Sequence, residues 1–152
     1  MTAIKKAMSA YGQATETIPP AQQIVMLYDG VLRFVKAAKA AVIDRRINDR
    51  YMAIQKATTI IEALQGCLDH DKGGDIALQL DRLYTHFVFR LQAVNMKDDP
   101  AICDELVERI GELRSSWAAI AAAEPGNGRG SSPSAEPARP QTNQGLAAAV
   151  TA

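Results

Sequence analysis

The sequence predicts an all-α domain, an antiparallel up-down-up-down four-helix bundle. Apolar residues recur every three or four positions through four long stretches, which is the pattern of amphipathic helices. No stretch alternates apolar and polar residues as a half-buried strand would. Four helices of about 20 residues, each roughly 30 Å long, must lie antiparallel when short turns connect them.

The first helix is predicted from about Pro20 to Asp44, and its apolar surface is unusually wide. Pro20 suits the first helical turn because the amide hydrogen that proline lacks has no helical partner there. Gly30 predicts a close crossing with another helix, since glycine in a helix interior otherwise costs about 1 kcal/mol relative to alanine. The apolar residues that recur at helical spacing are Ile24, Leu27, Tyr28, Val31, Val35, Ala38 and Val42.

The second and third helices are predicted over residues 49–68 and 75–96, with Asn48 or Asp49 as the N-cap of the second. The segment Asp69–Gly74 separates them and reads as a turn, because it contains two glycines, polar neighbours and no apolar residue. One of its two glycines is expected to adopt a positive φ.

The fourth helix is predicted over residues 100–122. Pro100 fits its first position, and Asp99 is the expected N-cap. Across the four helices, the residues assigned mainly to the core are Leu27, Tyr28, Val31, Phe87 and Trp117.

The two ends of the chain are predicted to lie outside the bundle, which occupies residues 18–123. Residues 1–17 read either as a frayed terminus or as an amphipathic flap that docks on the bundle and can be displaced. The flap alternative rests on three apolar residues at the spacing of one helical face, Ile4, Met8 and Tyr11. Residues 124–152 are rich in Gly, Pro and Ser, and are expected to be disordered.

Composition and charge exclude several classes of protein. The chain has 152 residues and a formal net charge of +0, which argues against a nucleic-acid partner and against attraction to an anionic membrane. Near the C-terminus, the longest apolar run is far shorter than the ~20 residues of a membrane span. Cys67 and Cys103 are far apart in sequence and suggest reduced thiols rather than a disulfide. We expect a cytoplasmic protein.

Catalytic, cofactor and metal motifs are missing from the sequence. A di-iron bundle needs Glu-x-x-His on two helices, and no such motif occurs. His70 is expected in the turn and His86 half-exposed on the third helix, without a third ligand at a useful spacing. The segment His70–Gly73 partly matches histidine phosphotransfer bundles, with a spacing one residue short. We therefore expect no enzyme and no cofactor, with a phosphotransfer bundle as the alternative.

Apolar residues outside the predicted core stripes suggest a surface that binds another protein. Scattered exposed apolar residues are common, but two helices that each carry a second stripe indicate a groove for a partner's helices. A bundle that self-associates through the same stripes, as a weak homodimer, is the alternative. These residues are Val25, Leu32 and Phe34 on the first helix, and Leu78, Val88 and Phe89 on the third.

Three segments resemble the flagellin export chaperone family, FliS. The first is MLYDGVLRF at Met26–Phe34, and the second runs from Leu68 to Asn95 through the turn KGGD and Leu83-Tyr84. The third is ELRSSW, which ends at Trp117. Thr85 and His86 stand where the family often has an acidic and an aromatic residue, which implies a client surface suited to a different flagellin.

The resemblance implies a non-enzymatic protein that binds the C-terminal segment of flagellin in the cytoplasm. Such chaperones keep flagellin monomeric and bring it to the flagellar type III export gate. Combined with the apolar pattern, the resemblance assigns Val25, Leu32, Leu78, Val88 and Phe89 to client contact. It assigns Ile4, Met8 and Tyr11 to a flap that also meets the export gate.

Overall fold

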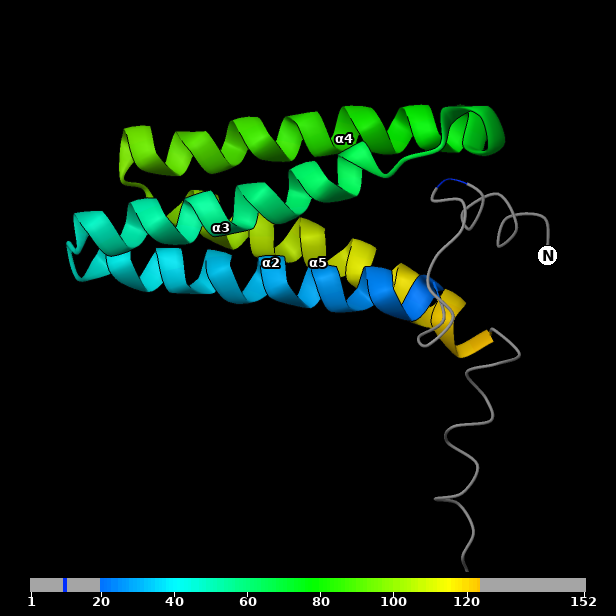
Figure 1. Cartoon of the computed structure of the whole chain (residues 1–152). Coiled ribbons are helices and arrows are strands. Elements are labelled where there is room, and N and C mark those ends of the chain that lie inside the picture. The colour runs from blue at the N-terminus through cyan, green and yellow to red at the C-terminus, as the bar shows by residue number, and fades with distance from the viewer. Residues whose placement is uncertain (1–9, 11–19, 124–152) are drawn as a thin grey trace, which may run out of the picture.

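The four expected helices form one antiparallel bundle in the computed structural model, which describes residue 10 and residues 20–123 (Figure 1). In chain order the helices are α2 (Pro20–Ile43), α3 (Ile47–Gly66), α4 (His70–Lys97) and α5 (Pro100–Ala123). The turns after α2 and after α4 lie at one end of the bundle, and the turn after α3 lies at the other (Figure 1). The up-down-up-down prediction is confirmed.

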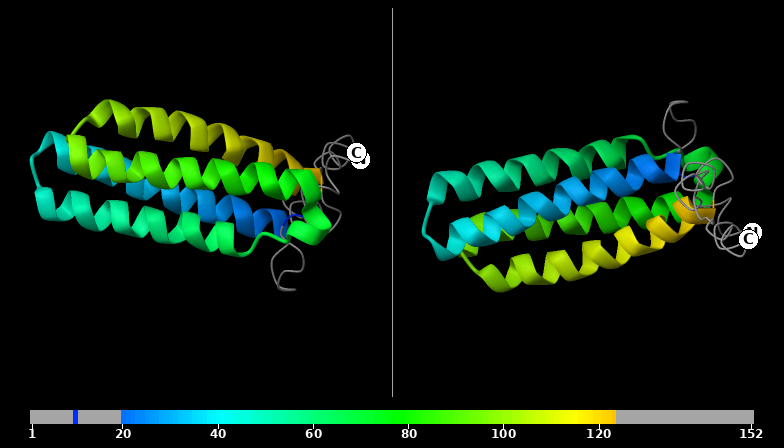
Figure 2. Two further views of the ribbon diagram at one scale, coloured as in Figure 1. Left: turned by 90° about the horizontal axis from the view of Figure 1, so that it is seen from above. Right: turned by 90° about the horizontal axis from the view of Figure 1, so that it is seen from below.

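Each helix packs mainly on two neighbours. Helix α2 contacts α3 and α5, and α4 contacts the same two helices from the opposite corner. In the view from above α4 and α3 lie nearer the viewer, and in the view from below α2 and α5 lie nearer (Figure 2). Because α2 lies between two helices that approach it closely, its wide apolar surface is used to pack on both.

Helix starts follow the predictions at the two prolines, and one predicted cap is wrong. Pro20 and Pro100 are the first residues of α2 and α5, and Asp99 caps α5 by accepting a 2.9 Å hydrogen bond from the amide of Ala101. Helix α3 begins at Ile47, before both predicted caps, Asn48 and Asp49, and its N-cap position makes no side-chain hydrogen bond. The carboxylate of Asp49 is instead 2.6 Å from the guanidinium of Arg46.

The predicted turn before the third helix is itself partly helical. Helix α4 begins at His70, where the Asp69 carboxylate caps it by accepting a 3.0 Å hydrogen bond from the amide of Lys72. The helix is interrupted at Gly74, whose φ of 52° and ψ of −126° lie outside the helical region. A glycine accepts this positive φ without the clash that a Cβ would cause. The regular helix resumes at the next residue, Asp75, where the third helix was predicted to begin.

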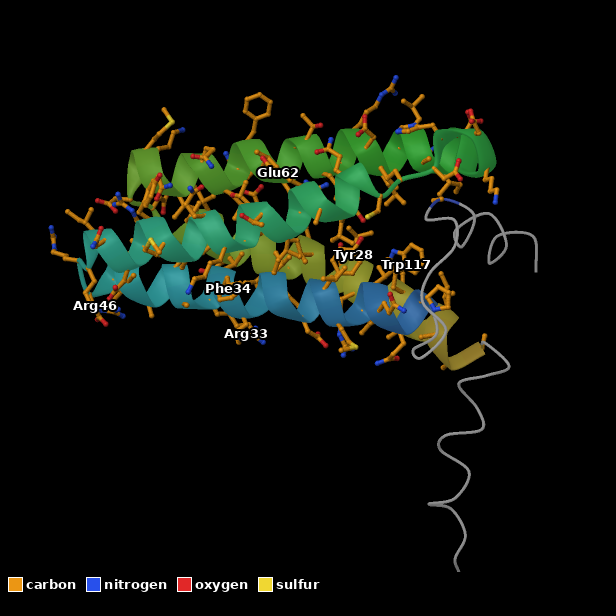
Figure 3. The ribbon with its side chains drawn as sticks, in the orientation of Figure 1. Tyr28, Arg33, Phe34, Arg46, Glu62 and Trp117 are labelled. Carbon is orange, nitrogen blue, oxygen red and sulfur yellow. The ribbon has the colours of Figure 1, made fainter. Side chains whose placement is uncertain are left out.

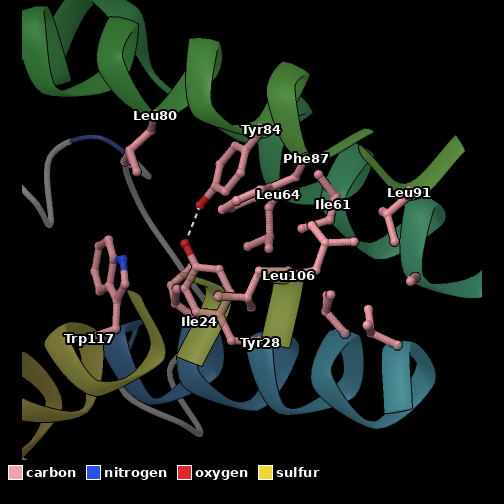
Figure 4. Close-up of a cluster of buried hydrophobic side chains, with 14 of the residues drawn as sticks. Ile24, Tyr28, Ile61, Leu64, Leu80, Tyr84, Phe87, Leu91, Leu106 and Trp117 are labelled. Carbon is pink, nitrogen blue, oxygen red and sulfur yellow. Dashed lines mark hydrogen bonds between the residues drawn. The ribbon is translucent and has the colours of Figure 1, made fainter. Parts of the chain in front are cut away.

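The core fills the space between the four helices with large side chains from each of them (Figure 4). Tyr28, Val31, Phe87 and Trp117 are buried, as predicted. The hydroxyl groups of Tyr28 and Tyr84 share a 2.5 Å hydrogen bond that connects α2 to α4 across the core. This bond satisfies two polar groups that would be costly to bury alone.

Two predictions about α2 are wrong in opposite directions. Val25, predicted at the surface, is 3% exposed, and Leu27, predicted in the core, is 38% exposed. Val25 lies one helical turn before Asp29, whose carboxylate pairs with α5, so α5 covers that side of α2.

The predicted close crossing at Gly30 is confirmed. A Cβ at this position would lie 3.1 Å from the Cδ1 of Ile60, so the glycine lets α3 approach the backbone of α2. Larger side chains at a crossing keep helix axes about 8–10 Å apart, and two helices that cross at a glycine can lie closer than this.

Replacing Thr58 with valine is expected to stabilise the bundle. The residue is 6% exposed on α3, and its hydroxyl oxygen has no hydrogen-bond partner among the described residues. Valine has nearly the same shape and no polar atom to bury, so Thr58→Val should raise the free energy of unfolding by about 1 kcal/mol. Urea denaturation measures this change. Exposed Thr59, on the same helix, provides the control, since Thr59→Val should change stability by less than about 0.5 kcal/mol.

Candidate functional site

The segments that carry the family resemblance hold the helices together. In the first segment, Tyr28 bonds to α4 and Gly30 meets Ile60 of α3. Asp29 accepts hydrogen bonds of 2.8 and 3.3 Å from the guanidinium of Arg114, which belongs to the third segment. These residues therefore fix the arrangement of the bundle, and the partner surface must be sought elsewhere.

A first groove, the α2–α3 groove, runs between α2 and the start of α3. Its lining combines small or flexible apolar residues with charged side chains. Alanines in the lining let a partner's backbone come close, and methionine adapts to different side chains. The lining residues are Phe34, Ala37, Ala40, Arg46, Asp49, Met52, Ala53 and Lys56.

The Phe34 ring, which lines this groove, has two cations near it. The Arg33 guanidinium is 5.1 Å from the ring centroid and the Lys56 ammonium is 5.5 Å away, both within cation–π range. Figure 3 shows Phe34 and Arg33 on α2, with Arg46 in the turn that follows. Arg46 is paired with Asp44 and Asp49, and the hydrogen bond to Asp49 is the main cause that raises the pKa of its guanidinium.

A second groove, the α3–α4 groove, lies on the other side of α3. Its apolar residues are Val88, which is half-buried, and Phe89, which is 71% exposed. Gln65 fixes one wall, since its side-chain amide donates hydrogen bonds to Asp81 and to the hydroxyl of Thr85. The remaining lining residues are Glu62, Gln65, Thr85 and Gln92, and Glu62 is labelled on α3 in Figure 3.

The residues predicted to contact a client divide into four groups. Leu78 and Phe89 are exposed on α4, as a contact residue requires. Leu32 and Val88 are half-buried against the core, and only Val88 lines a groove described above. Val25 is buried and is withdrawn as a contact residue. The three predicted flap residues, Ile4, Met8 and Tyr11, lie outside the described residues, as does the predicted tail from Glu124.

Sequence reasoning missed several exposed apolar residues. Met52 lies in the α2–α3 groove, and its position outside the stripe of α3 was the available signal. Met96 was missed because it is the last apolar residue of α4, yet it is 80% exposed. The other large exposed apolar residues that were not predicted are Met26, Ile43, Ile47 and Tyr51.

The N-terminal segment contacts the turn between α3 and α4 at Ala10. This residue is fully buried, and its carbonyl oxygen accepts a 2.5 Å hydrogen bond from the amide of Asp69. A Cβ added to Gly73 would lie 2.7 Å from the Cα of Ala10 and 2.8 Å from the Cβ of Ala77. Because Gly73 has no Cβ, it makes room for Ala10 at this position.

Replacing Gly73 with alanine is expected to remove Ala10 from this position. The new Cβ would meet the backbone of Ala10 rather than a flexible side chain. Gly73→Ala should therefore lower the free energy of unfolding by about 1–3 kcal/mol or displace the segment that contains Ala10. Hydrogen exchange then detects faster exchange of the Asp69 amide. The control is Gly111→Ala, because a Cβ there meets nothing within 4 Å and alanine should gain up to about 1 kcal/mol. Unchanged protection of the Asp69 amide in the Gly73 variant would contradict this prediction.

Two histidines and two cysteines are the described residues whose side chains most often bind metals or act as nucleophiles. No group of three or more His, Cys, Asp or Glu side chains in the described part of the chain is placed to hold a metal ion. His70 and His86 are both exposed, so His86 is less covered than predicted. Cys103 is buried, and desolvation raises the pKa of its thiol to about 11, while Cys67 is exposed. Both cysteines are free thiols, as predicted.

Comparison with known proteins decides the family. A family model described as flagellar protein FliS matches residues 4–124, which cover all four helices. The chain belongs to the FliS family. The match ends one residue after α5, so the family and the bundle end together.

Individual members of the FliS family are similar along most of their own length. The flagellar secretion chaperone FliS of Vibrio cholerae is 36% identical over 98 residues, which cover 64% of this chain and 72% of the relative. FliS of Campylobacter jejuni is 32% identical over 112 residues, or 73% of this chain and 88% of the relative. FliSB of Pseudomonas aeruginosa is 32% identical over 120 residues, or 76% and 95% of the two chains.

As a member of the FliS family, this chain is a flagellar secretion chaperone, and its four-helix fold fits that family. None of the described helices combines the length and the apolar character that crossing a membrane requires. The α2–α3 groove and the α3–α4 groove lie on the two sides of α3 in this FliS-family bundle.

Proposed function

We propose that this chain is a cytoplasmic, non-enzymatic chaperone that binds the C-terminal segment of flagellin. It prevents premature polymerisation of flagellin and delivers it to the flagellar type III export apparatus. The observation that carries the proposal is the pair of apolar grooves on either side of α3, in a chain of the FliS family.

A client segment that is unfolded before binding suits these grooves. Such a segment can place one short helix beside α2 and another beside α4. The chain between these two helices then crosses over α3. Binding buries apolar surface along both grooves, but the client loses conformational entropy as it becomes ordered. The affinity per unit area is therefore lower than for two folded partners, which permits release at the export apparatus.

The α2–α3 groove supplies a charge preference as well as apolar contact. Arg33 and Lys56 flank Phe34 and make no salt bridge with another described residue, whereas Arg46 is already paired. An acidic residue on the client helix would therefore find two available cations beside an aromatic ring. The α3–α4 groove offers Phe89 and Val88 among three neutral polar residues and one acidic residue, Glu62, and so favours an apolar client face without a negative charge.

The regions outside the bundle are assigned roles in the same proposal. Residues 1–17 form a displaceable flap on the bundle of residues 18–123, with Ile4, Met8 and Tyr11 as contacts to the bundle and to the export gate. The hydrogen bond and close packing of Ala10 at the α3–α4 turn support this assignment. Residues 124–152 are proposed to be a disordered tail without an assigned role.

Calorimetric titration tests the proposal. The protein is titrated with the last ~40 residues of flagellin from the same organism, a segment long enough to fill both grooves. Saturable one-to-one binding with a negative heat-capacity change is expected, because that sign marks the burial of apolar surface. The same titration with a peptide of identical composition and scrambled order is the control. Absence of binding by the native segment, with the flap residues 1–17 deleted as well as present, would overturn the proposal.

A further inference from the structure

A third groove, the α4–α5 groove, lies between the two neighbouring helices that pack on each other least. The contact between α4 and α5 is smaller than the contact in each of the other three neighbouring pairs. The groove holds about 210 Å³, and its apolar lining residues are Leu83, Phe87 and Leu113. Phe87 is buried, whereas Leu83 and Leu113 are only half-buried. A cavity of ~150 Å³ accepts a benzene molecule, so this groove has room for branched aliphatic side chains.

The polar residues of the α4–α5 groove show which kind of occupant it fits. They are Arg109, Glu112 and Ser116, all exposed on α5. Arg109 and Glu112 lie three positions apart on one helix, so their opposite charges offset each other. The groove therefore attracts neither an acidic nor a basic segment, and its half-buried leucines favour an uncharged apolar one.

We propose that residues 146–150 of the same chain, Leu-Ala-Ala-Ala-Val, dock in the α4–α5 groove. This stretch contains the only leucine and the only valine after Ala123, and no charged residue follows Arg139. Leu146 and Val150 lie four positions apart, so a single helical turn places both on one face. The three alanines between them have the highest helix propensity of any residue. The stretch thus has the apolar and neutral character that the groove favours.

The position where α5 ends brings this stretch within reach of the groove. Helix α5 ends at Ala123, at the end of the bundle where α4 begins (Figure 1). Leu113 lies about 15 Å back along α5, at 1.5 Å per residue. The 22 residues from 124 to 145 are rich in Gly, Pro and Ser, and an unfolded linker of this length spans about 25 Å on average. The linker therefore reaches the groove without being stretched, and gives the stretch an effective concentration of about millimolar there.

Paramagnetic relaxation, measured by NMR on the full chain, tests the docking. Cys67→Ser removes the exposed native thiol, the other native thiol is buried, and Thr151→Cys then carries a nitroxide label beside the stretch. The amide signals of Leu83 and Leu113 should broaden. The amide of Ile60 lies at a similar height in the bundle but on α3, and should broaden much less. Sharp signals at Leu83 and Leu113, or equal broadening of all three, would overturn the inference.

Two variants of the labelled chain separate docking from simple proximity. Leu146→Asp places a charge in the apolar contact, so the relaxation enhancement at Leu83 and Leu113 should fall at least ~3-fold. Thr142→Asp adds the same charge four positions earlier, outside the docking stretch, and should leave the enhancement unchanged. Equal enhancement in the two variants would refute docking through residues 146–150.

A mixed sample identifies the chain that supplies the stretch. An isotope-labelled chain without the nitroxide is combined with an unlabelled chain that carries it, each at about 0.1 mM. Little broadening is expected at Leu83 and Leu113, because the stretch of the same chain is present at a higher effective concentration. Broadening as strong as in the single-chain sample would assign the groove to a second copy and overturn the inference.

Discussion

Replacing Phe89 with aspartate is expected to weaken client binding strongly while the bundle remains folded. The side chain is 71% exposed and lines the α3–α4 groove, so its loss removes little from the core. In the complex, however, the aspartate would be an unpaired charge within an apolar contact, which costs several kcal/mol. We expect the affinity for the flagellin segment to fall roughly 100-fold or more, measured by calorimetric titration.

The matched control for this result is Ile47→Asp. Ile47 is 65% exposed and begins α3, but it lines neither groove beside α3. An acidic residue in a first helical turn is favourable, so this variant should fold and bind the client as the wild type does. Equal loss of affinity in the two variants would mean that the client uses the end of the bundle instead of the α3–α4 groove.

Replacing Phe87 with alanine is expected to have the opposite profile, a large loss of stability. Phe87 is two residues from Phe89 but is 1% exposed, and it packs in the core beside Tyr84 and Leu91 (Figure 4). Removing a buried phenyl ring leaves a cavity and should lower the free energy of unfolding by about 3–5 kcal/mol. Chemical denaturation followed by circular dichroism measures the change.

Phe89→Ala is the comparison for this second prediction. The same loss of a phenyl ring from an exposed position should change the free energy of unfolding by less than about 0.5 kcal/mol. The two variants differ only in the direction in which the ring points from α4. If Phe89→Ala were the more destabilising of the two, Phe89 rather than Phe87 would face the core, which would contradict the prediction.

The sequence determined the elements of this protein to a large extent. Helical periodicity predicted four helices, and the starts at Pro20 and Pro100 follow from the fixed φ and the missing amide hydrogen of proline. Gly30 and Gly74 behave as their lack of a Cβ predicts, one at a helix crossing and one at a positive φ. These features are local, so the residues that cause them lie close together in the chain.

The exposure of the residues that we propose for partner contact was determined by the sequence only in part. Leu78 and Phe89 follow from counting positions around α4, because only one side of that helix faces the core. The predictions that Val25 is exposed and that Leu27 is buried were both wrong, because the sequence does not say which side of α2 each of α3 and α5 covers. The rotation of a helix between two neighbours is decided by their side chains, which are distant in sequence.

Tertiary structure also decided what the resembling segments do. Tyr28 and Asp29 belong to the most recognisable segment of the sequence, yet they bond to Tyr84 of α4 and Arg114 of α5. Each of those bonds joins residues at least 56 positions apart, so no local pattern predicts them. The grooves have the same origin, since each is lined by two helices and exists only where their side chains fail to fill the space between them.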